Sequence, residues 1–157
     1  PWHGSLKSIK SVPTDKVLVE SKCRTDDNID WGVGIRSAST SVRDNSMLAW
    51  ARAYYDDLYA SIFDDDTHYY SAIDVGFNIP NHTYYIIQGI VDGDTFTARI
   101  LDLDFNLLAS VSVTHHAPNL GDKTLIWGYN RAAWDWIRVR KYTEPEPSVS
   151  VGAEETA

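Results

Sequence analysis

HTYYIIQGIVDGDTFTARIL, at residues 82–101, indicates the fold more clearly than any other part of the chain. Tyrosine, isoleucine, valine, phenylalanine and threonine, which favour strands, fill both halves of this segment. Asp92-Gly93-Asp94 separates the halves, and Asp-Gly between two β-rich runs is a strong hairpin signal. A second turn at Asp104-Phe105-Asn106 leads into another β-rich run, residues 107–114. The sequence therefore predicts a three-stranded antiparallel meander.

The rest of the chain also follows a period of two, which is typical of strands with one buried face. In residues 47–54, Leu48, Trp50, Arg52 and Tyr54 alternate with alanines, so we interpret this stretch as a strand and not as a helix. The glycines of Trp31-Gly-Val-Gly-Ile-Arg36 indicate a bulge or a close backbone approach. Further strands are expected at residues 17–23, 31–36, 58–63, 71–79, 124–129 and 134–142.

The acidic residues indicate turns. The chain has 157 residues and a formal net charge of −8, and 17 of its 22 acidic residues are Asp. Asp favours turns, whereas Glu favours helices. Four of the five Glu lie in the last fourteen residues, which leaves Glu20 alone in the body. About nine or ten short strands joined by Asp-rich turns predict an all-β fold, a two-sheet antiparallel sandwich of the jelly-roll kind.

The same composition bounds the organisation of the chain. The length fits one domain, at residues 1–143, and the Pro- and Glu-rich residues 144–157 are expected to form a tail or linker. The chain begins at Pro1, and we expect a processed product or a piece of a longer protein. The acidic balance argues against nucleic acid as a partner, and no apolar run of about 18 residues predicts a transmembrane segment. The single cysteine, Cys23, excludes an internal disulfide framework.

Three segments together resemble the concanavalin A-like (laminin-G-like) jelly-roll superfamily. They are the early strand pair at 17–22 and 31–36, the meander at 84–102, and the ending Trp134-Asp-Trp-Ile-Arg-Val-Arg-Lys-Tyr142 with its Pro/Glu continuation. That ending is similar to the C-terminus of jelly-roll modules in large archaeal and bacterial surface proteins. The resemblance covers residues 15–152 and implies an extracellular, sugar-binding or adhesive sandwich, without defining a ligand.

A glycoside hydrolase is the first enzymatic possibility, because some proteins of this fold are glucanases. Their chemistry needs two carboxylates flanking the scissile bond, supplied in those enzymes by Glu-x-Asp-x-Glu on one strand face. The chain lacks that motif. Asp102 and Asp104 share one face but run directly into a turn, so we interpret them as a hairpin end. The sequence therefore predicts that the protein is not an enzyme.

A calcium ion is the cofactor that the sequence allows. Ca²⁺ needs six to eight oxygen ligands, and Asp64, Asp65 and Asp66 form the densest run of acidic residues in the chain. Proteins of the resembled superfamily often hold a structural Ca²⁺. The alternative is that these residues simply form a turn.

The aromatic residues suggest a binding surface. Tyrosine and tryptophan rings pack on the apolar faces of sugar rings, and neighbouring Asp or Asn side chains orient the hydroxyls. The alternative is that one ring of each adjacent pair lies in the core. The predicted ligand-binding residues are Tyr54, Tyr59, Tyr69, Tyr84 and Trp127.

From these observations we predict a noncatalytic, lectin-like module at the cell surface that binds a glycan or another cell-surface polymer, or mediates adhesion. The alternative is a structural subunit of a surface layer or filament, a homo-oligomer in which the tail or the Trp2 segment adds a strand to a neighbouring sheet. A glycoside hydrolase is the third possibility.

Overall fold

A computed structural model describes residues 4–7, 16–25, 30–38, 45–64, 68–128 and 132–143. All regular secondary structure within these ranges is β-strand. The same ranges contain no helix that is long and apolar enough to span a membrane. The strands are β1 (Gly4–Lys7), β2 (Lys16–Thr25), β3 (Asp30–Ser37), β4 (Ser46–Arg52), β5 (Asp57–Phe63), β6 (Tyr69–Val75), β7 (Tyr85–Asp92), β8 (Thr95–Leu101), β9 (Leu107–Thr114), β10 (Lys123–Gly128) and β11 (Ala132–Lys141).

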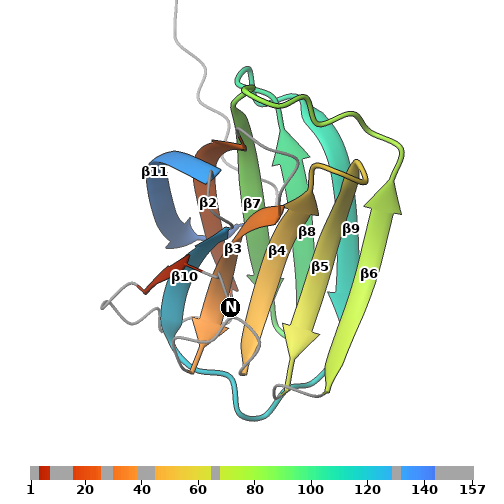
Figure 1. Ribbon diagram of the computed structural model, residues 1–157. Helices are drawn as coiled ribbons and strands as arrows, with labels where there is room; N and C mark the ends of the chain where they lie inside the picture. Colours follow the sequence, from red (N-terminus) through yellow and green to blue (C-terminus); the bar gives the residue numbers. More distant parts are fainter. Residues whose placement is uncertain are drawn as a thin grey trace, which may run out of the picture.

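The strands form two antiparallel sheets packed face to face. One sheet has six strands in the order β1-β10-β3-β4-β5-β6, and the other has five in the order β11-β2-β7-β8-β9. In Figure 1 the five-stranded sheet lies behind the six-stranded one. Strands distant in sequence are neighbours in both sheets, such as β3 beside β10 and β2 beside β7. This arrangement confirms the predicted two-sheet antiparallel sandwich.

The predicted meander is present as β7, β8 and β9. Gly93 takes a left-handed φ of 60° in the first turn, as an Asp-Gly hairpin requires. In the second turn the Asp102 carboxylate accepts hydrogen bonds from the backbone N–H groups of Asp104 and Asn106, both at 2.9 Å. The turn chemistry recognised in the sequence therefore forms both hairpins.

The core lies between the two sheets and follows the alternation of the strands. Trp31, Val33 and Ile35 of β3 are fully buried in the same hydrophobic cluster as Phe96 of β8. Cys23 is a free thiol in that cluster, and its burial raises the pKa of the thiol. The side chains that alternate with these residues point away from the core, so each sheet has an outer face.

Gly32 lies on the outer face of β3, where the sequence predicted a bulge or a close approach. A Cβ atom there would collide with the carbonyl oxygen of Ala49 and lie 2.7 Å from the Cβ of Trp50. The close approach is confirmed, and it presses β3 against β4 beneath Trp50.

The strand bounds differ from the sequence-based expectation in several places. β1 was not predicted. The strand expected at 47–54 ends at Arg52, because the N–H of Tyr55 donates to the carbonyl of Arg52 and Asp56 takes a φ of 52°. The strand expected at 71–79 is β6, which begins at Tyr69 and ends before Gly76, whose φ is 96°. The predicted tail at 144–157 lies outside the described residues.

Candidate functional site

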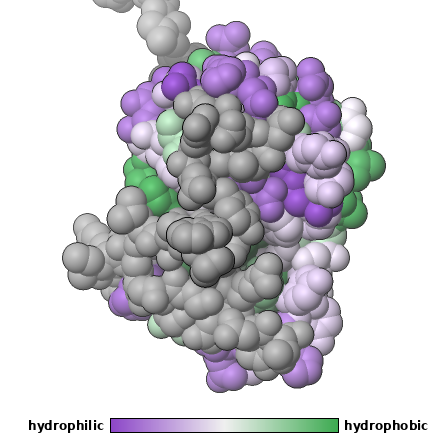
Figure 2. All heavy atoms as spheres, viewed as in Figure 1, coloured by the Kyte–Doolittle hydropathy of each residue, from purple (hydrophilic) through white to green (hydrophobic). Residues whose placement is uncertain are grey.

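The outer face of the six-stranded sheet carries a polar and aromatic cluster. The register of β4 and β5 pairs Trp50 with Tyr59 and Arg52 with Asp57, and β3 places Asp30 opposite Arg52. We call these five residues the Arg52 cluster. Figure 2 looks onto the six-stranded sheet and shows strongly hydrophilic atoms, right of the centre, beside pale atoms of intermediate hydropathy.

Arg52 and Asp57 form a bidentate ion pair at the centre of the cluster. The Nε of Arg52 donates to Asp57 Oδ1 at 2.9 Å, and its Nη2 donates to Oδ2. Asp57 is only 2% exposed, so Arg52 supplies the positive charge that compensates a buried carboxylate. The hydrogen bond from Arg52 to Asp57 is the main reason why the pKa of Arg52 is raised. The guanidinium is therefore held in one orientation.

The aromatic rings around Arg52 hold one another in place. The rings of Trp50 and Tyr59 stack at 4.3 Å with an interplanar angle of 16°, and Trp127 meets Trp50 edge-on at 5.7 Å. The indole N–H of Trp50 donates to Ser61 Oγ at 3.0 Å. Because Trp50 and Tyr59 stack, each ring covers one face of the other, and those two faces are closed to a ligand.

Free ring surface lies in the turn between β4 and β5. Tyr54 and Tyr55 are 66% and 61% exposed and meet edge-to-face at 4.8 Å. The guanidinium of Arg52 lies 4.3 Å from the centre of the Tyr55 ring, a cation–π distance. The turn therefore adds two exposed rings to the edge of the Arg52 cluster.

The structure brings together some of the residues predicted from sequence. Tyr59 is a member of the Arg52 cluster, and Tyr54 lies in the adjoining turn. Trp127 contacts the cluster through Trp50, although it is only 5% exposed. Tyr69 is on the same sheet, at the opposite end of β5 and β6. Tyr84 directly precedes β7 of the other sheet, and the side chains of Lys22 and Arg24 lie over its ring.

Sequence reasoning missed the charged residues of the cluster, Asp30, Arg52 and Asp57. The available signal was a charged residue within an apolar alternation, because Arg52 follows Leu48 and Trp50 on the same strand face. An arginine at such a position needs a partner carboxylate, and Asp57 is the first residue of the next strand.

Asp30 gives the cluster a measurable pH dependence. Burial is the main reason why the pKa of Asp30 is raised from its ordinary 3.8; Arg52 lowers it and Asp57 raises it further. The folded state therefore binds more protons than the unfolded state between the two pKa values, so Asp30 reduces stability as the pH rises through that window. We expect the stability of Asp30→Asn relative to wild type to increase with pH above about 3.8 and then level off. Urea unfolding from pH 3 to 7 measures this, and a pH-independent difference would contradict it.

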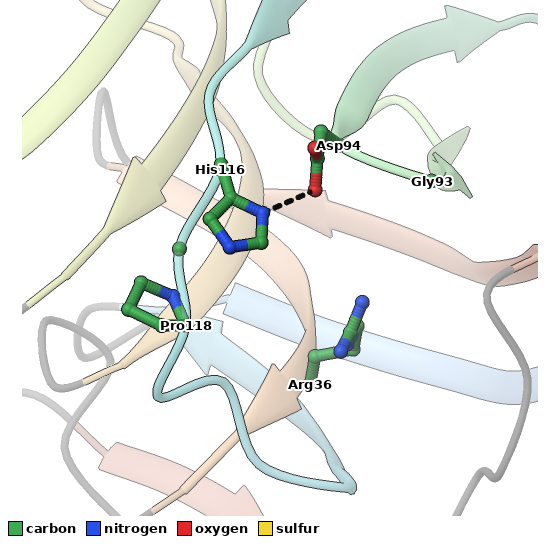
Figure 3. Close-up of a pocket in the computed structure, with 6 residues that line it drawn as sticks. Arg36, Gly93, Asp94, His116 and Pro118 are labelled. Atoms are coloured by element: carbon green, nitrogen blue, oxygen red, sulfur yellow. Dashed lines mark hydrogen bonds and ion pairs between the residues drawn. The ribbon is translucent and has the colours of Figure 1, made fainter.

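A second feature is a pocket of about 420 Å³, drawn in Figure 3. It is lined by Arg36, which lies at the end of β3 away from the β4–β5 turn. The described residues that line it are Arg36, Gly93, Asp94, His116, Ala117 and Pro118. They come from β3, the β7–β8 turn and the segment after β9. The Nδ1 of His116 lies 3.1 Å from Asp94 Oδ1.

The predicted calcium site is only partly described. Asp64 Oδ2 lies 2.9 Å from His115 Nε2, whereas Asp65 and Asp66 are outside the described residues. Within the described ranges no three His, Cys, Asp or Glu side chains gather as a metal site. The calcium ion therefore stays a prediction.

Asp102 has the role of a turn residue. Besides two backbone N–H groups, its carboxylate accepts a hydrogen bond from the Asn106 side chain at 2.8 Å. These contacts, the Asn106 side chain first, lower the pKa of Asp102. A carboxylate engaged in this way closes the β8–β9 turn, as interpreted from the sequence.

Neither a protein-family model nor a curated protein sequence matches the chain. Several solved structures, by contrast, are similar to it in fold. The carbohydrate-binding module CBM66 from Bacillus subtilis superposes with a TM-score of 0.69 at 17% identity, over 89% of this chain and 83% of that one. A galectin, LEC-6, from Caenorhabditis elegans gives 0.61 at 9% identity, over 86% and 89% of the two chains. The Bacillus licheniformis β-glucanase gives 0.59 at 12% identity, over 87% and 71%.

These structures are all concanavalin A-like jelly-roll sandwiches, and this chain has the same fold. The resemblance stated from the sequence is thereby confirmed for the fold. Identities of this size establish architecture alone, because one fold carries binding modules, lectins and hydrolases.

Proposed function

We propose that the protein is a noncatalytic, extracellular carbohydrate-binding module and that the Arg52 cluster, together with Tyr54 and Tyr55, is its glycan site. The observation that carries this proposal is the fixed Arg52–Asp57 pair beside two exposed tyrosine rings. The similar structures include a carbohydrate-binding module and galectins, and this supports the ligand class.

The chemistry of the cluster suits a neutral sugar. A sugar presents hydroxyl groups, which both donate and accept hydrogen bonds, and apolar C–H faces. A guanidinium has five N–H groups. In Arg52, the Nε–H and one N–H of Nη2 donate to the Asp57 carboxylate. The remaining donors are held in known directions and can bind hydroxyl oxygens, while an exposed tyrosine ring packs against a C–H face.

The noncatalytic part of the proposal rests on the state of the carboxylates. Glycoside hydrolysis needs an acid and a nucleophile or base on opposite sides of the scissile bond. The Asp57 carboxylate is bound by Arg52, and the Asp102 carboxylate is bound by N–H groups of its own turn.

Assembly by strand addition remains the alternative prediction. The two segments that would add the strand, the Trp2 segment and the tail at 144–157, both lie outside the described residues.

Tyr55 provides the test of this site. We expect Tyr55→Ala to weaken glycan binding about tenfold, which corresponds to about 1.4 kcal/mol, because the mutation removes the exposed ring beside Arg52. Affinity electrophoresis against β-glucan, fructan, galactan and mannan measures binding. Tyr84→Ala is the matched control, since the Tyr84 ring lies against Lys22 and Arg24 of the opposite sheet, and it should bind as wild type does. Wild type that binds none of these neutral polymers, or equal loss in both variants, would contradict the proposal.

A further inference from the structure

We propose that the protein forms a dimer with a second copy of itself, in which the two β6 strands pair antiparallel across a two-fold axis. The pairing joins the two six-stranded sheets edge to edge. β6 is the last strand of its sheet, and Figure 1 shows it at the right-hand edge of the sandwich. Three properties of this edge support the dimer: its exposed apolar side chains, its free backbone and its complementarity to itself.

The exposed apolar side chains of the molecule gather at this edge. Among the described residues twelve large hydrophobic side chains are exposed, and eight of them lie on β6, in the β8–β9 turn or at the start of β9. β6 carries four of them in seven residues, each between 45% and 63% exposed: Tyr69, Tyr70, Ile73 and Val75. Figure 2 shows green, hydrophobic atoms on the right-hand rim, the side on which Figure 1 places β6. Apolar surface gathered in this way indicates an interaction site.

The backbone of β6 is open for pairing. An edge strand presents N–H and C=O groups that no neighbouring strand binds, and natural sheets protect such edges with lysine, proline or a bulge. β6 contains no lysine or proline, and its register against β5 runs without a shift from Tyr69 to Val75. Within the described part of the chain, no backbone hydrogen bond joins the free side of β6 to another segment. β6 is therefore a regular and unprotected edge strand.

The one charged residue of β6 does not block this edge. The Asp74 carboxylate accepts a hydrogen bond from the backbone N–H of Ser110 in β9, at 3.2 Å. It is therefore directed toward the other sheet. The same contact occupies a backbone N–H of β9, the edge strand of the five-stranded sheet on this side of the sandwich.

β6 is complementary to a second copy of itself. When all seven residues pair, the two-fold axis lies at Ala72, which then faces Ala72 of the other copy. On the outer face Tyr69 of one copy lies opposite Val75 of the other, so apolar side chains meet on both sides of the axis. Asp74 lies opposite Tyr70 and not opposite the second Asp74, so the like charges stay apart.

The apolar area on β6 fits a weak dimer. A fully exposed large side chain presents about 150–250 Å², so the four on β6 expose roughly 400 Å² per copy. Together with the paired backbone, two copies bury about 1,000 Å², which is the size of a weak and reversible interface. The association is therefore expected to depend on concentration.

The dimer gives the proposed glycan site a partner on the same surface. Pairing at β6 places two Arg52 clusters on one continuous outer face, each on β4, two strands inward from β6. At about 4.8 Å per strand, the two β4 strands lie about 24 Å apart. Two linked sites bind a polymer more tightly than either site alone. This consequence rests on the proposed function, whereas the dimer itself is tested without a glycan.

Sedimentation equilibrium of the full chain, without glycan, tests the dimer. We expect a reversible monomer–dimer equilibrium that Ile73→Lys weakens at least tenfold, because the variant adds a positive charge on each side of the axis. Ile137→Lys is the matched control: Ile137 is 41% exposed on the edge strand β11, at the opposite side of the sandwich, and Ile73 is 47% exposed. The control should dimerise as wild type does, and both variants should keep the melting temperature of wild type.

Three results would overturn the proposal. They are a wild type that stays monomeric, a dimer that survives in Ile73→Lys, and a dimer that both variants weaken equally. A further variant distinguishes pairing of the β6 strands from strand addition by the tail. Val149→Lys with Val151→Lys, in the full chain, should dimerise as wild type does. Loss of the dimer in that variant would assign the contact to the tail and contradict pairing of β6 with itself.

Ala72→Cys tests the register. Directly opposed residues of antiparallel strands have Cα atoms about 4.5–5.5 Å apart, a distance that a disulfide can bridge. The natural Cys23 is buried and does not compete. Under oxidation Ala72→Cys should crosslink into dimers at least tenfold faster than Ser112→Cys, which places a cysteine at an exposed position of β9. Equal rates would contradict the self-complementary register, and with it the choice of a second copy as the partner.

Discussion

Arg52→Ala is expected to lower the free energy of unfolding by about 3 kcal/mol and to weaken glycan binding by at least about 30-fold. The stability loss arises because the mutation leaves the carboxylate of Asp57, which is 2% exposed, without its compensating charge. The binding loss arises because the same guanidinium supplies the proposed donors to the sugar. Chemical denaturation measures the first effect, and affinity electrophoresis below the unfolding transition measures the second.

A double variant separates these two effects. In Arg52→Met with Asp57→Leu, no buried charge is left unpaired, so most of the lost stability should return. Glycan binding should remain absent, because no donor is restored. If the double variant is as unstable as Arg52→Ala, the cost does not come from an unpaired Asp57. If Arg52→Ala still binds glycan normally, the proposed site is wrong.

Trp31→Ala is expected to have the largest effect on the fold itself. Trp31 lies in the core with 0% of its surface exposed to solvent. Replacing a buried large aromatic residue with alanine lowers the free energy of unfolding by about 3–5 kcal/mol. For a chain of this size we expect the melting temperature to fall by about 10 °C. Differential scanning calorimetry measures the shift.

Trp31→Phe is the matched control for that prediction. The indole Nε1 of Trp31 is buried without a hydrogen-bond partner, so phenylalanine removes an unsatisfied polar atom and keeps most of the apolar volume. We expect a loss smaller than half of that in Trp31→Ala. Equal losses in the two variants would show that the detailed shape of the indole, and not its volume, stabilises the core. Glycan binding should survive in the folded fraction of both, since Trp31 points away from the outer face.

Local sequence patterns were sufficient to predict the class of fold. Alternation and turn chemistry are local properties, and both can be followed in residues 82–114. Asp92-Gly93 and Asp102 to Asn106 form their turns through contacts only a few residues apart. The strands at 95–101 and 107–114 therefore begin and end where the pattern predicts.

Which residues come together in a site depends on contacts between distant parts of the chain. The β4–β5 turn lies two residues earlier than alternation suggests, and the Asp56 carboxylate in that turn accepts the N–H of Ile79, 23 residues away. This turn aligns Arg52 with Asp57. The pocket likewise needs Arg36, Asp94 and His116, which come from separate strands and loops. An alternating pattern specifies that a side chain points to one face, but the side chain that lies opposite is set by sheet order and register, which depend on contacts distant in the sequence.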